Sequence, residues 1–187
     1  MLLHVRNMVC DRCIFVVRQQ LERLGYEVQD ISLGQVQVSP DPDESALTVI
    51  DNSFREIGFE LLSDEKEKLV AAVKSKVIEY VHYSDLNNLR QGLIATIAAD
   101  LNKDPAYLSR LFSETENSTI ERYIIQQKTE KVKELLAYGE LNLNEISFKL
   151  GYSSSSHLSS QFKTVVGMSP SQYKLGTHPQ RRSLDQL

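Results

Sequence analysis

The sequence predicts two domains: an α+β domain with a β-α-β-β-α-β order over residues 1–65, followed by an all-α domain with two helix-turn-helix units over residues 85–176. Three observations predict this division. The net charge of the first third is opposite in sign to that of the rest, strand-like alternation occurs only in the first third, and a helical motif occurs twice in the remainder. Residues 66–84 are expected to form a linker or first helix, and residues 177–187 a polar tail.

The charge of the chain is informative only when it is divided between the two predicted domains. The whole chain of 187 residues has a formal net charge of −4, which by itself argues against a nucleic-acid partner. Residues 1–65, however, hold five Lys or Arg against twelve Asp or Glu, and residues 66–187 hold sixteen against thirteen. The acidic excess therefore belongs to the first domain, and the second has a modest basic excess. This difference predicts different partners for the two domains.

The composition, with 41% hydrophobic and 25% charged residues, is typical of a soluble globular protein. No stretch approaches the roughly 18 consecutive apolar residues that a membrane-spanning helix needs. The opening segment meets a charge at Arg6, too early for the apolar core of a secretory signal. We therefore expect a cytoplasmic protein that does not associate with a membrane.

The first domain shows regular changes in the spacing of its apolar residues. Alternation predicts a strand at residues 3–5, a hairpin of residues 26–33 and 35–39 around Gly34, and a last strand at residues 59–62. Apolar residues at spacings of 3, 4 and 3 predict two amphipathic helices: Ile14, Val17, Leu21 and Leu24 before Gly25, and Leu47, Ile50, Phe54 and Ile57 before Gly58. The resulting order is the split βαβ of the ferredoxin-like fold.

Both cysteines of the chain, Cys10 and Cys13, lie in one C-x-x-C sequence between the first strand and the first helix. In a reducing compartment such a pair is more often metal-binding or redox-active than structural. Thiolates at a helix N-terminus are stabilised by the helix dipole and prefer soft ions such as Cu(I), whereas Zn(II) needs further ligands. His4 and His82 have no second ligand at a useful spacing and are predicted to be surface or strand histidines.

The loop that holds the cysteines resembles the M-x-C-x-x-C loop of heavy-metal-associated domains, through Met8-Val9-Cys10-Asp11-Arg12-Cys13. Gly58-Phe59 resembles the Gly-aromatic pair of that family, while Asn7 stands where the family usually has Gly. The resemblance implies Cu(I) or Zn(II) binding by Cys10 and Cys13, with Met8 packed inward, Phe59 shielding the site, and a metal ion or a metallochaperone as partner. Two alternatives stay open: a domain that only dimerises or binds a protein or small molecule, and a thiol-redox protein.

The second domain contains an internal repeat. Residues 97–102 are echoed by residues 146–151 at an offset of 49, and the apolar residues that follow are echoed at an offset of 50: Leu108 and Phe112 by Leu158 and Phe162. Each copy predicts a helix, a turn and a second helix. Asn102 and Gly151 stand at the turns, where a residue that tolerates a positive φ is required.

Helix-capping residues divide the second domain further. The second helices of the two units are predicted to begin after Asp104, which Pro105 follows, and after Ser154. Two capping boxes and one Ser-Pro pair mark the starts of the other helices: Ser118 with Glu121 before a long helix through Leu136, Asn142 with Glu145, and Ser169-Pro170.

The order of residues in the second copy resembles the C-terminal half of AraC/XylS-type transcription regulators. The residues that carry this resemblance are Ile146, Gly151-Tyr152, Leu158, Phe162-Lys163 and Gly167 through Tyr173, and Tyr107 through Phe112 resemble the family's first recognition helix. The resemblance covers about residues 75–175. It implies seven helices, with two helix-turn-helix units that are joined by a long helix and each insert one helix into the major groove of double-stranded DNA.

The resemblance also implies which side chains face DNA: Ala106, Ser109 and Arg110 in the first unit, and Ser155, Ser156, His157, Ser159, Ser160 and Lys163 in the second. Arg110 is the best candidate for a bidentate contact with guanine, which contributes about 1–3 kcal/mol of discrimination. Lys163 is expected to bind phosphate. We expect the first unit to read sequence and the serine-rich second unit mainly to position the protein.

The sequence therefore predicts a DNA-binding transcription regulator of the AraC type, with a homodimer among the expected assemblies and a thiophilic metal ion at Cys10 and Cys13 as the expected effector. The chain has no Gly-rich phosphate loop and no Ser paired with a plausible base, so it is not expected to be an enzyme.

Overall fold

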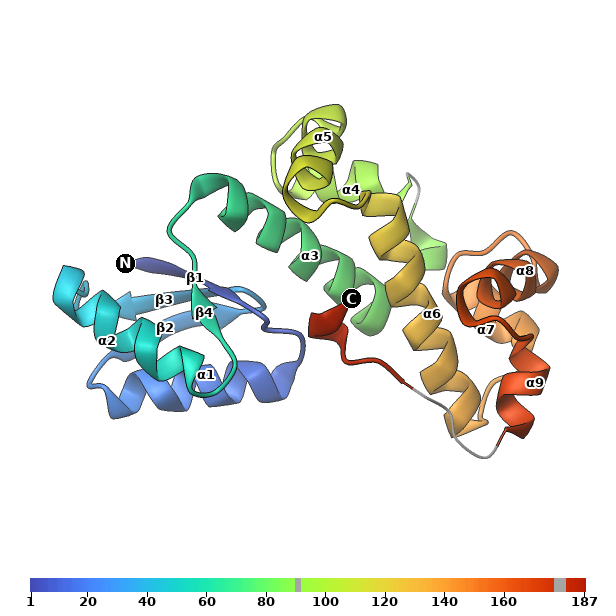
Figure 1. Cartoon of the computed structure of the whole chain (residues 1–187), viewed down its shortest axis with the longest axis horizontal. Coiled ribbons are helices and arrows are strands. Elements are labelled where there is room, and N and C mark those ends of the chain that lie inside the picture. Colours follow the sequence, from blue (N-terminus) through green and yellow to red (C-terminus); the bar gives the residue numbers. More distant parts are fainter. Residues whose placement is uncertain (90–91, 177–180) are drawn as a thin grey trace. The chain divides into compact units, whose positions relative to one another are not determined.

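The computed structural model describes residues 1–89, 92–176 and 181–187 (Figure 1). The chain divides into two compact units, Met1–Ser75 and Lys76–Leu187. The sequence placed the boundary at residues 65 and 66, whereas this division falls inside one helix, α3 (Glu65–Tyr83). Among the described residues, no helix is long and apolar enough to cross a membrane.

The first unit contains a four-stranded antiparallel sheet and two helices before α3. Its elements are β1 (Leu2–Arg6), α1 (Asp11–Arg23), β2 (Glu27–Ser32), β3 (Gln35–Ser39), α2 (Glu44–Arg55) and β4 (Glu60–Leu61). The strands are ordered β2-β3-β1-β4, so the first strand of the sequence is central and pairs with both β3 and β4. In this register Leu3 lies opposite Val36 and Val5 opposite Leu61. The order of strands and helices along the chain is the predicted one.

The core of the first unit lies between the sheet and the pair α1 and α2, which cover one face of the sheet (Figure 1). The predicted stripes supply its helical side: Val17, Leu21, Ile50 and Phe54 are fully buried against strand residues such as Val36. Burying a side chain of this size contributes about 1.5–3 kcal/mol. The fold of this unit therefore follows from its apolar spacing.

The second unit is helical. It comprises the end of α3, then η1 (Leu86–Asn88), α4 (Leu93–Asp100), α5 (Pro105–Glu116), α6 (Ile120–Tyr138), α7 (Leu143–Lys149), α8 (Ser155–Val166), α9 (Pro170–Leu175) and η2 (Leu184–Gln186). The long helix α6 lies between the pair α4 and α5 and the group α7 to α9 (Figure 1). Its buried residues Val132 and Leu136 form a core with Ile146, Leu158 and Phe162 of the second helical repeat.

Most predicted helix starts are confirmed in atomic detail. The side chains of Asp104 and Ser154 accept hydrogen bonds from the backbone N–H groups three residues on, and Asn142 and Ser169 form complete capping boxes. The predicted box at Ser118 is wrong, because Thr119 is the N-cap of α6 and accepts from the N–H of Arg122.

The physical reason for this shift lies at the end of the preceding helix. Asn117 ends α5 in the left-handed conformation, with φ of 51°, which leaves Ser118 in the turn. The helix therefore begins one residue later than the capping pattern suggested.

One expectation about the rest of the chain is corrected. His82 is neither on the surface nor in a strand: it lies on α3, is 9% exposed, and its Nε2 is 2.8 Å from Oε1 of the fully buried Gln127. The predicted polar tail includes residues 177–180, which lie outside the described residues. Its described part packs on α6, where Nε2 of Gln127 donates to the carbonyl of Leu184 and the Arg182 N–H donates to Glu130.

Candidate functional site

The first helix-turn-helix unit consists of α4, a turn and α5. Ile97 and Ala98 bury one side of α4, and Leu108, Leu111 and Phe112 bury the inner side of α5. Asn102 makes the turn between them with a φ of 50°, as predicted. Because its inner side is packed and its first turn is capped, α5 is a fixed helix with an outer side that faces away from the core.

The second helix-turn-helix unit, formed by α7 and α8, repeats this construction. Ile146 and Leu150 are fully buried before the turn, and Leu158 and Phe162 are buried after it. Gly151 makes the turn with a φ of 66°. A Cβ atom at Gly151 would lie 3.4 Å from both Cβ and the carbonyl oxygen of Leu86, which is van der Waals contact.

The outer side of α5 carries the residues predicted to face DNA. Ala106 and Arg110 are exposed, and Ser109 is half-buried. The guanidinium carbon of Arg110 lies 5.9 Å from the centre of the Tyr107 ring, at the outer limit of a cation–π contact. Arg110 and Tyr107 therefore stand on one exposed face, three residues apart.

The outer side of α8 is rich in hydroxyl groups. Ser156 and Ser160 are exposed, whereas Ser155 and Ser159 are half-buried. The hydroxyl of Ser159 donates to the carbonyl of Ser155 at 2.8 Å, so it is engaged within the helix. Lys163, one turn further on, is exposed and supplies a positive charge at the end of this face.

His157 stands near the start of α8 and is held from two directions. Its Nδ1 lies 3.1 Å from the hydroxyl of Ser153, and its ring meets the ring of Tyr152 edge-on, with 5.4 Å between the centres. Nζ of Lys128 on α6 lies over the Tyr152 ring, 4.9 Å from the ring centre. Burial lowers the pKa of Lys128 below its usual value.

The cysteine pair lies at the start of α1 in the first unit. Cys10 is the N-cap residue and Cys13 lies in the first turn, and their sulfur atoms are 3.5 Å apart. Both residues are partly exposed. Burial raises the pKa of Cys13 above its usual range. As the resemblance implies, Met8 is buried, with 2% of its surface exposed.

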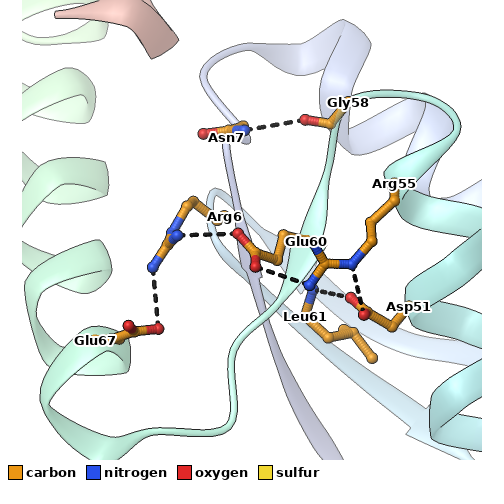
Figure 2. Close-up of polar contacts among 8 residues, drawn as sticks. All are labelled: Arg6, Asn7, Asp51, Arg55, Gly58, Glu60, Leu61 and Glu67. Atoms are coloured by element: carbon orange, nitrogen blue, oxygen red, sulfur yellow. Dashed lines mark hydrogen bonds and ion pairs between the residues drawn. The ribbon is translucent and has the colours of Figure 1, made fainter.

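Asn7 ties the cysteine loop to its surroundings. It has a φ of 74°, a conformation that Gly adopts readily and that Asn tolerates best among the other residues. Its side-chain Nδ2 donates to the carbonyl of Gly58 at 3.0 Å, as Figure 2 shows, and its own carbonyl accepts from the Cys13 thiol at 3.9 Å. Asn7 thus holds a left-handed backbone at this position and bridges the cysteine loop to the turn before β4.

A chain of ion pairs begins at the neighbouring residue, Arg6 (Figure 2). One of its guanidinium nitrogens lies 2.9 Å from Glu60 of β4, and the other lies 3.0 Å from Glu67 in the first turns of α3. Arg55 of α2 pairs with the second oxygen of Glu60 and with Asp51, each at 2.8 Å. This network connects α2, β4, β1 and the start of α3.

The geometry of the cysteine pair can be tested against a metal site. Zinc–sulfur bonds of about 2.3 Å in a tetrahedron separate two sulfurs by about 3.8 Å. The observed 3.5 Å is close to this value, so the pair fits one edge of such a site. Within residues 1–89, 92–176 and 181–187, no group of three or more His, Cys, Asp or Glu is arranged to hold a metal ion. The chain therefore supplies two soft ligands, and a tetrahedral ion would need others.

The sequence did not predict the contacts of three residues that shape these sites. Tyr107 lies beneath Arg110, Tyr152 holds both His157 and Lys128, and Asn7 anchors the thiols. The spacing of three residues between Tyr107 and Arg110 on one helix was a usable signal. The contacts of Tyr152 and Asn7 with residues far along the chain had no such signal.

Comparison with known proteins assigns the helical part of the chain. The family model of a helix-turn-helix domain matches residues 97–175. The chain is 31% identical over 111 residues to the Msm operon regulatory protein of Streptococcus mutans serotype c, a match that covers 59% of this chain and 39% of that protein. It is 27% identical over 117 residues to YdeC of Bacillus subtilis strain 168, an uncharacterized helix-turn-helix-type transcriptional regulator, covering 63% and 39% respectively.

A solved structure shows the same fold. The C-terminal domain of AraT, a response regulator from Geobacillus stearothermophilus, aligns with 64% of this chain and 97% of its own, with a TM-score of 0.51 and 24% identity. The chain spans 39% of the length of both curated relatives. The family model falls within the second unit, where the two helical repeats lie. Residues 97–175 of the chain therefore match a helix-turn-helix domain.

Proposed function

We propose that the protein is a sequence-specific DNA-binding transcription regulator of the AraC type. The observation that carries this proposal is the pair of helix-turn-helix units, each with a capped second helix whose inner side is buried and whose outer side is exposed. A helix held in this way can enter the major groove and present side chains from its N-terminal part to base edges. The names of the two curated relatives describe regulators, which supports the same proposal.

The two helix-turn-helix units contribute differently to DNA recognition in this proposal. Arg110 on α5 offers a planar fork of donors that matches O6 and N7 of guanine, so the first helix-turn-helix unit reads the DNA sequence. The α8 face offers short hydroxyls, part of which are engaged within the helix, and the cation Lys163. Contacts of this kind go mainly to phosphates and set position rather than sequence.

The experiment is selection of DNA sites from a random pool with the full chain, followed by affinity measurements on selected and random duplexes. Arg110→Ala is expected to weaken binding to the selected site by about 1–3 kcal/mol and leave random DNA nearly unaffected. Lys163→Ala should weaken both equally and reduce the salt dependence. Failure to enrich any site would refute the proposal, and equal losses from Arg110→Ala on both duplexes would refute the role of Arg110.

We further infer that the N-terminal unit, Met1–Ser75, is a ferredoxin-like domain of the heavy-metal-associated type that binds a thiophilic ion. The support is the cysteine pair, with sulfurs 3.5 Å apart at a helix start, together with the buried Met8. Cys10 and Cys13 would hold the ion, which would screen the two thiolates from each other. Asn7 would keep the loop in its bound conformation through its bridge to Gly58.

A titration of the full chain with Cu(I) against a competing chelator tests this second proposal. One ion per chain at sub-micromolar free metal, lost in Cys10→Ser with Cys13→Ser, is the expected result. Absence of binding would leave a unit that only dimerises or binds another partner. Unchanged DNA affinity after metal loading would rule out the ion as effector.

A further inference from the structure

Cys10 and Cys13 supply both sulfur atoms of a disulfide but only two of the ligands of a tetrahedral metal site. A tetrahedral metal site needs ligands beyond the two thiols, and the described residues place no third His, Cys, Asp or Glu with them to hold a metal ion. A disulfide needs two sulfurs and nothing else from the chain. We propose that Cys10 and Cys13 form a reversible intramolecular disulfide, and that Asn7 and Arg6 connect this redox site to the first turns of α3.

The local structure holds the two sulfurs together before any reaction. The carbonyl of Cys10 accepts hydrogen bonds from the N–H groups of Cys13 and Ile14, at 2.9 and 3.2 Å, which forms the first turn of α1. This turn places both side chains on one side of the loop, with 3.5 Å between the sulfurs. Both residues are partly exposed, so a small disulfide in solution can reach them. The entropy of bringing the thiols together has therefore been spent in folding.

The oxidant in this proposal is a low-molecular-weight disulfide such as glutathione disulfide. One cysteine thiolate attacks a sulfur of that molecule, forming a mixed disulfide and releasing one reduced thiol. The second cysteine thiolate then attacks the protein sulfur of the mixed disulfide and releases the other reduced thiol. The two cysteines lose two electrons, the small disulfide gains them, and the two cysteine protons pass to the released thiolates.

The hydrogen bonds around Cys13 give the reaction a structural consequence. In the reduced pair the Cys13 thiol donates to the carbonyl of Asn7. A disulfide sulfur has no hydrogen to donate, so oxidation removes this bond. The next residue back along the chain is Arg6, whose guanidinium pairs with Glu67 of α3 (Figure 2). The segment that loses its bond to the thiol is thus the segment that anchors the first turns of α3.

Arg6 and Asn7 also reach a further element of the first unit. The other arm of Arg6 reaches Glu60, and Nδ2 of Asn7 reaches Gly58, so β4 is held by the same two residues. Helix α3 starts in the first unit and runs on into the second. A change at its first turns is therefore a change at the segment that joins the two units covalently.

The first experiment measures the thiols of the full chain in glutathione buffers with a rising share of the disulfide. Samples are quenched with acid, alkylated and weighed by mass spectrometry. We expect both thiols to be lost together, with a mass decrease of two hydrogens, and to return with dithiothreitol. In Cys13→Ser the reaction should stop at one glutathione adduct. Two thiols that stay alkylatable in glutathione disulfide, or a lasting adduct in the unmodified chain, would overturn the proposed site.

The second experiment tests the connection to α3 by amide hydrogen exchange of the reduced and oxidised full chain. Oxidation is expected to speed exchange at residues 65–69. Arg6→Gln should show fast exchange there in both redox states, because the pair with Glu67 is gone. The matched control is Arg12→Gln, which removes a charge from the cysteine loop itself and should keep the response. Equal exchange in the two redox states of the unmodified chain would overturn the connection, and both readouts are independent of DNA binding.

Discussion

Asn102 and Gly151 occupy the same position in the two helix-turn-helix units and share a left-handed backbone, with φ of 50° and 66°. The N–H of each residue donates to a carbonyl three residues back, Ala99 in the first unit and Phe148 in the second, at 3.1 and 3.0 Å. The turn is therefore one structure made from two different residue types. Asn tolerates this conformation better than other non-Gly residues, and Gly151 adopts it freely because it has no side chain.

Gly151→Ala is expected to destabilise the second helix-turn-helix unit through the cost of a left-handed backbone at Ala. A left-handed Ala costs about 1–2 kcal/mol. A Cβ here would lie 3.4 Å from two atoms of Leu86, which is van der Waals contact and adds no large cost. Gly139, with φ of 72° and nothing within 4 Å of a Cβ, is the matched control for the conformational cost. Denaturant unfolding of Gly151→Ala and Gly139→Ala measures both losses, and a clearly larger loss in Gly151→Ala would contradict a purely conformational cost.

The position of the N-cap of α6 predicts different losses of stability when Thr119 and Ser118 are replaced by Ala. Thr119→Ala should lower the free energy of unfolding by about 0.5–2 kcal/mol, because the N–H of Arg122 loses its acceptor. Ser118→Ala should have little effect, since Ser118 precedes the cap. Thermal unfolding of the two variants decides between the positions. A larger loss in Ser118→Ala would restore the box that the sequence suggested.

His82 predicts a loss of stability in acid. Burial holds the pKa of His82 below its ordinary value of 6.5, the hydrogen bond with Gln127 and the charge of Glu134 oppose this, and Lys131 and Arg181 add to it. The unfolded chain therefore binds a proton at a higher pH than the folded chain does. Stability is retained above 6.5 and is lost as pH falls through 6.5 toward the lower folded pKa.

The measurement for His82 is the urea midpoint of the full chain and of His82→Gln between about pH 7.5 and pH 5.5. The unmodified chain should lose stability across this interval, and the variant should lose less. His4, whose pKa burial also lowers, remains in both proteins and so cancels from the comparison. Parallel curves for the two proteins would show that His82 is not the group responsible.

Tyr107 is expected to tune how sharply the protein reads its site. If the ring orders the Arg110 side chain before binding, Tyr107→Leu removes about 0.5–1 kcal/mol of specific affinity, a factor of about two to five. Tyr107→Phe keeps the ring and should keep the ratio of specific to random binding. This ratio, measured on the selected and random duplexes, is the readout. A loss in Tyr107→Phe as large as in Tyr107→Leu would point to the hydroxyl instead.

The capping residues and apolar stripes show how far local reasoning reached. Asp104, Asn142, Ser154 and Ser169 act within three residues of the helices they cap, so their roles could be predicted from spacing alone. Thr119 could not, because the end of α5 decides where the turn leaves off. Local patterns therefore fix which helices form more reliably than where each one starts.

Long-range polar contacts lay beyond any sequence pattern. His82 and Gln127 are 45 positions apart, and Arg6 and Glu67 are 61 apart, yet each pair is in direct contact. Nothing about the residues between them specifies these partners. The described part of the polar tail likewise contacts a residue far along the chain, because Arg181 pairs with Glu134 on α6.

The sequence by itself determined the order of elements, the two helical repeats and the resemblance of the second unit, because these depend on the spacing of apolar and capping residues along the chain. The tertiary structure decided which polar groups are satisfied and by whom. It brought Asn7 to Gly58 and set the sulfurs of Cys10 and Cys13 3.5 Å apart. The physical reason is that a buried or engaged polar group needs a partner in space, and only the folded chain brings distant residues together.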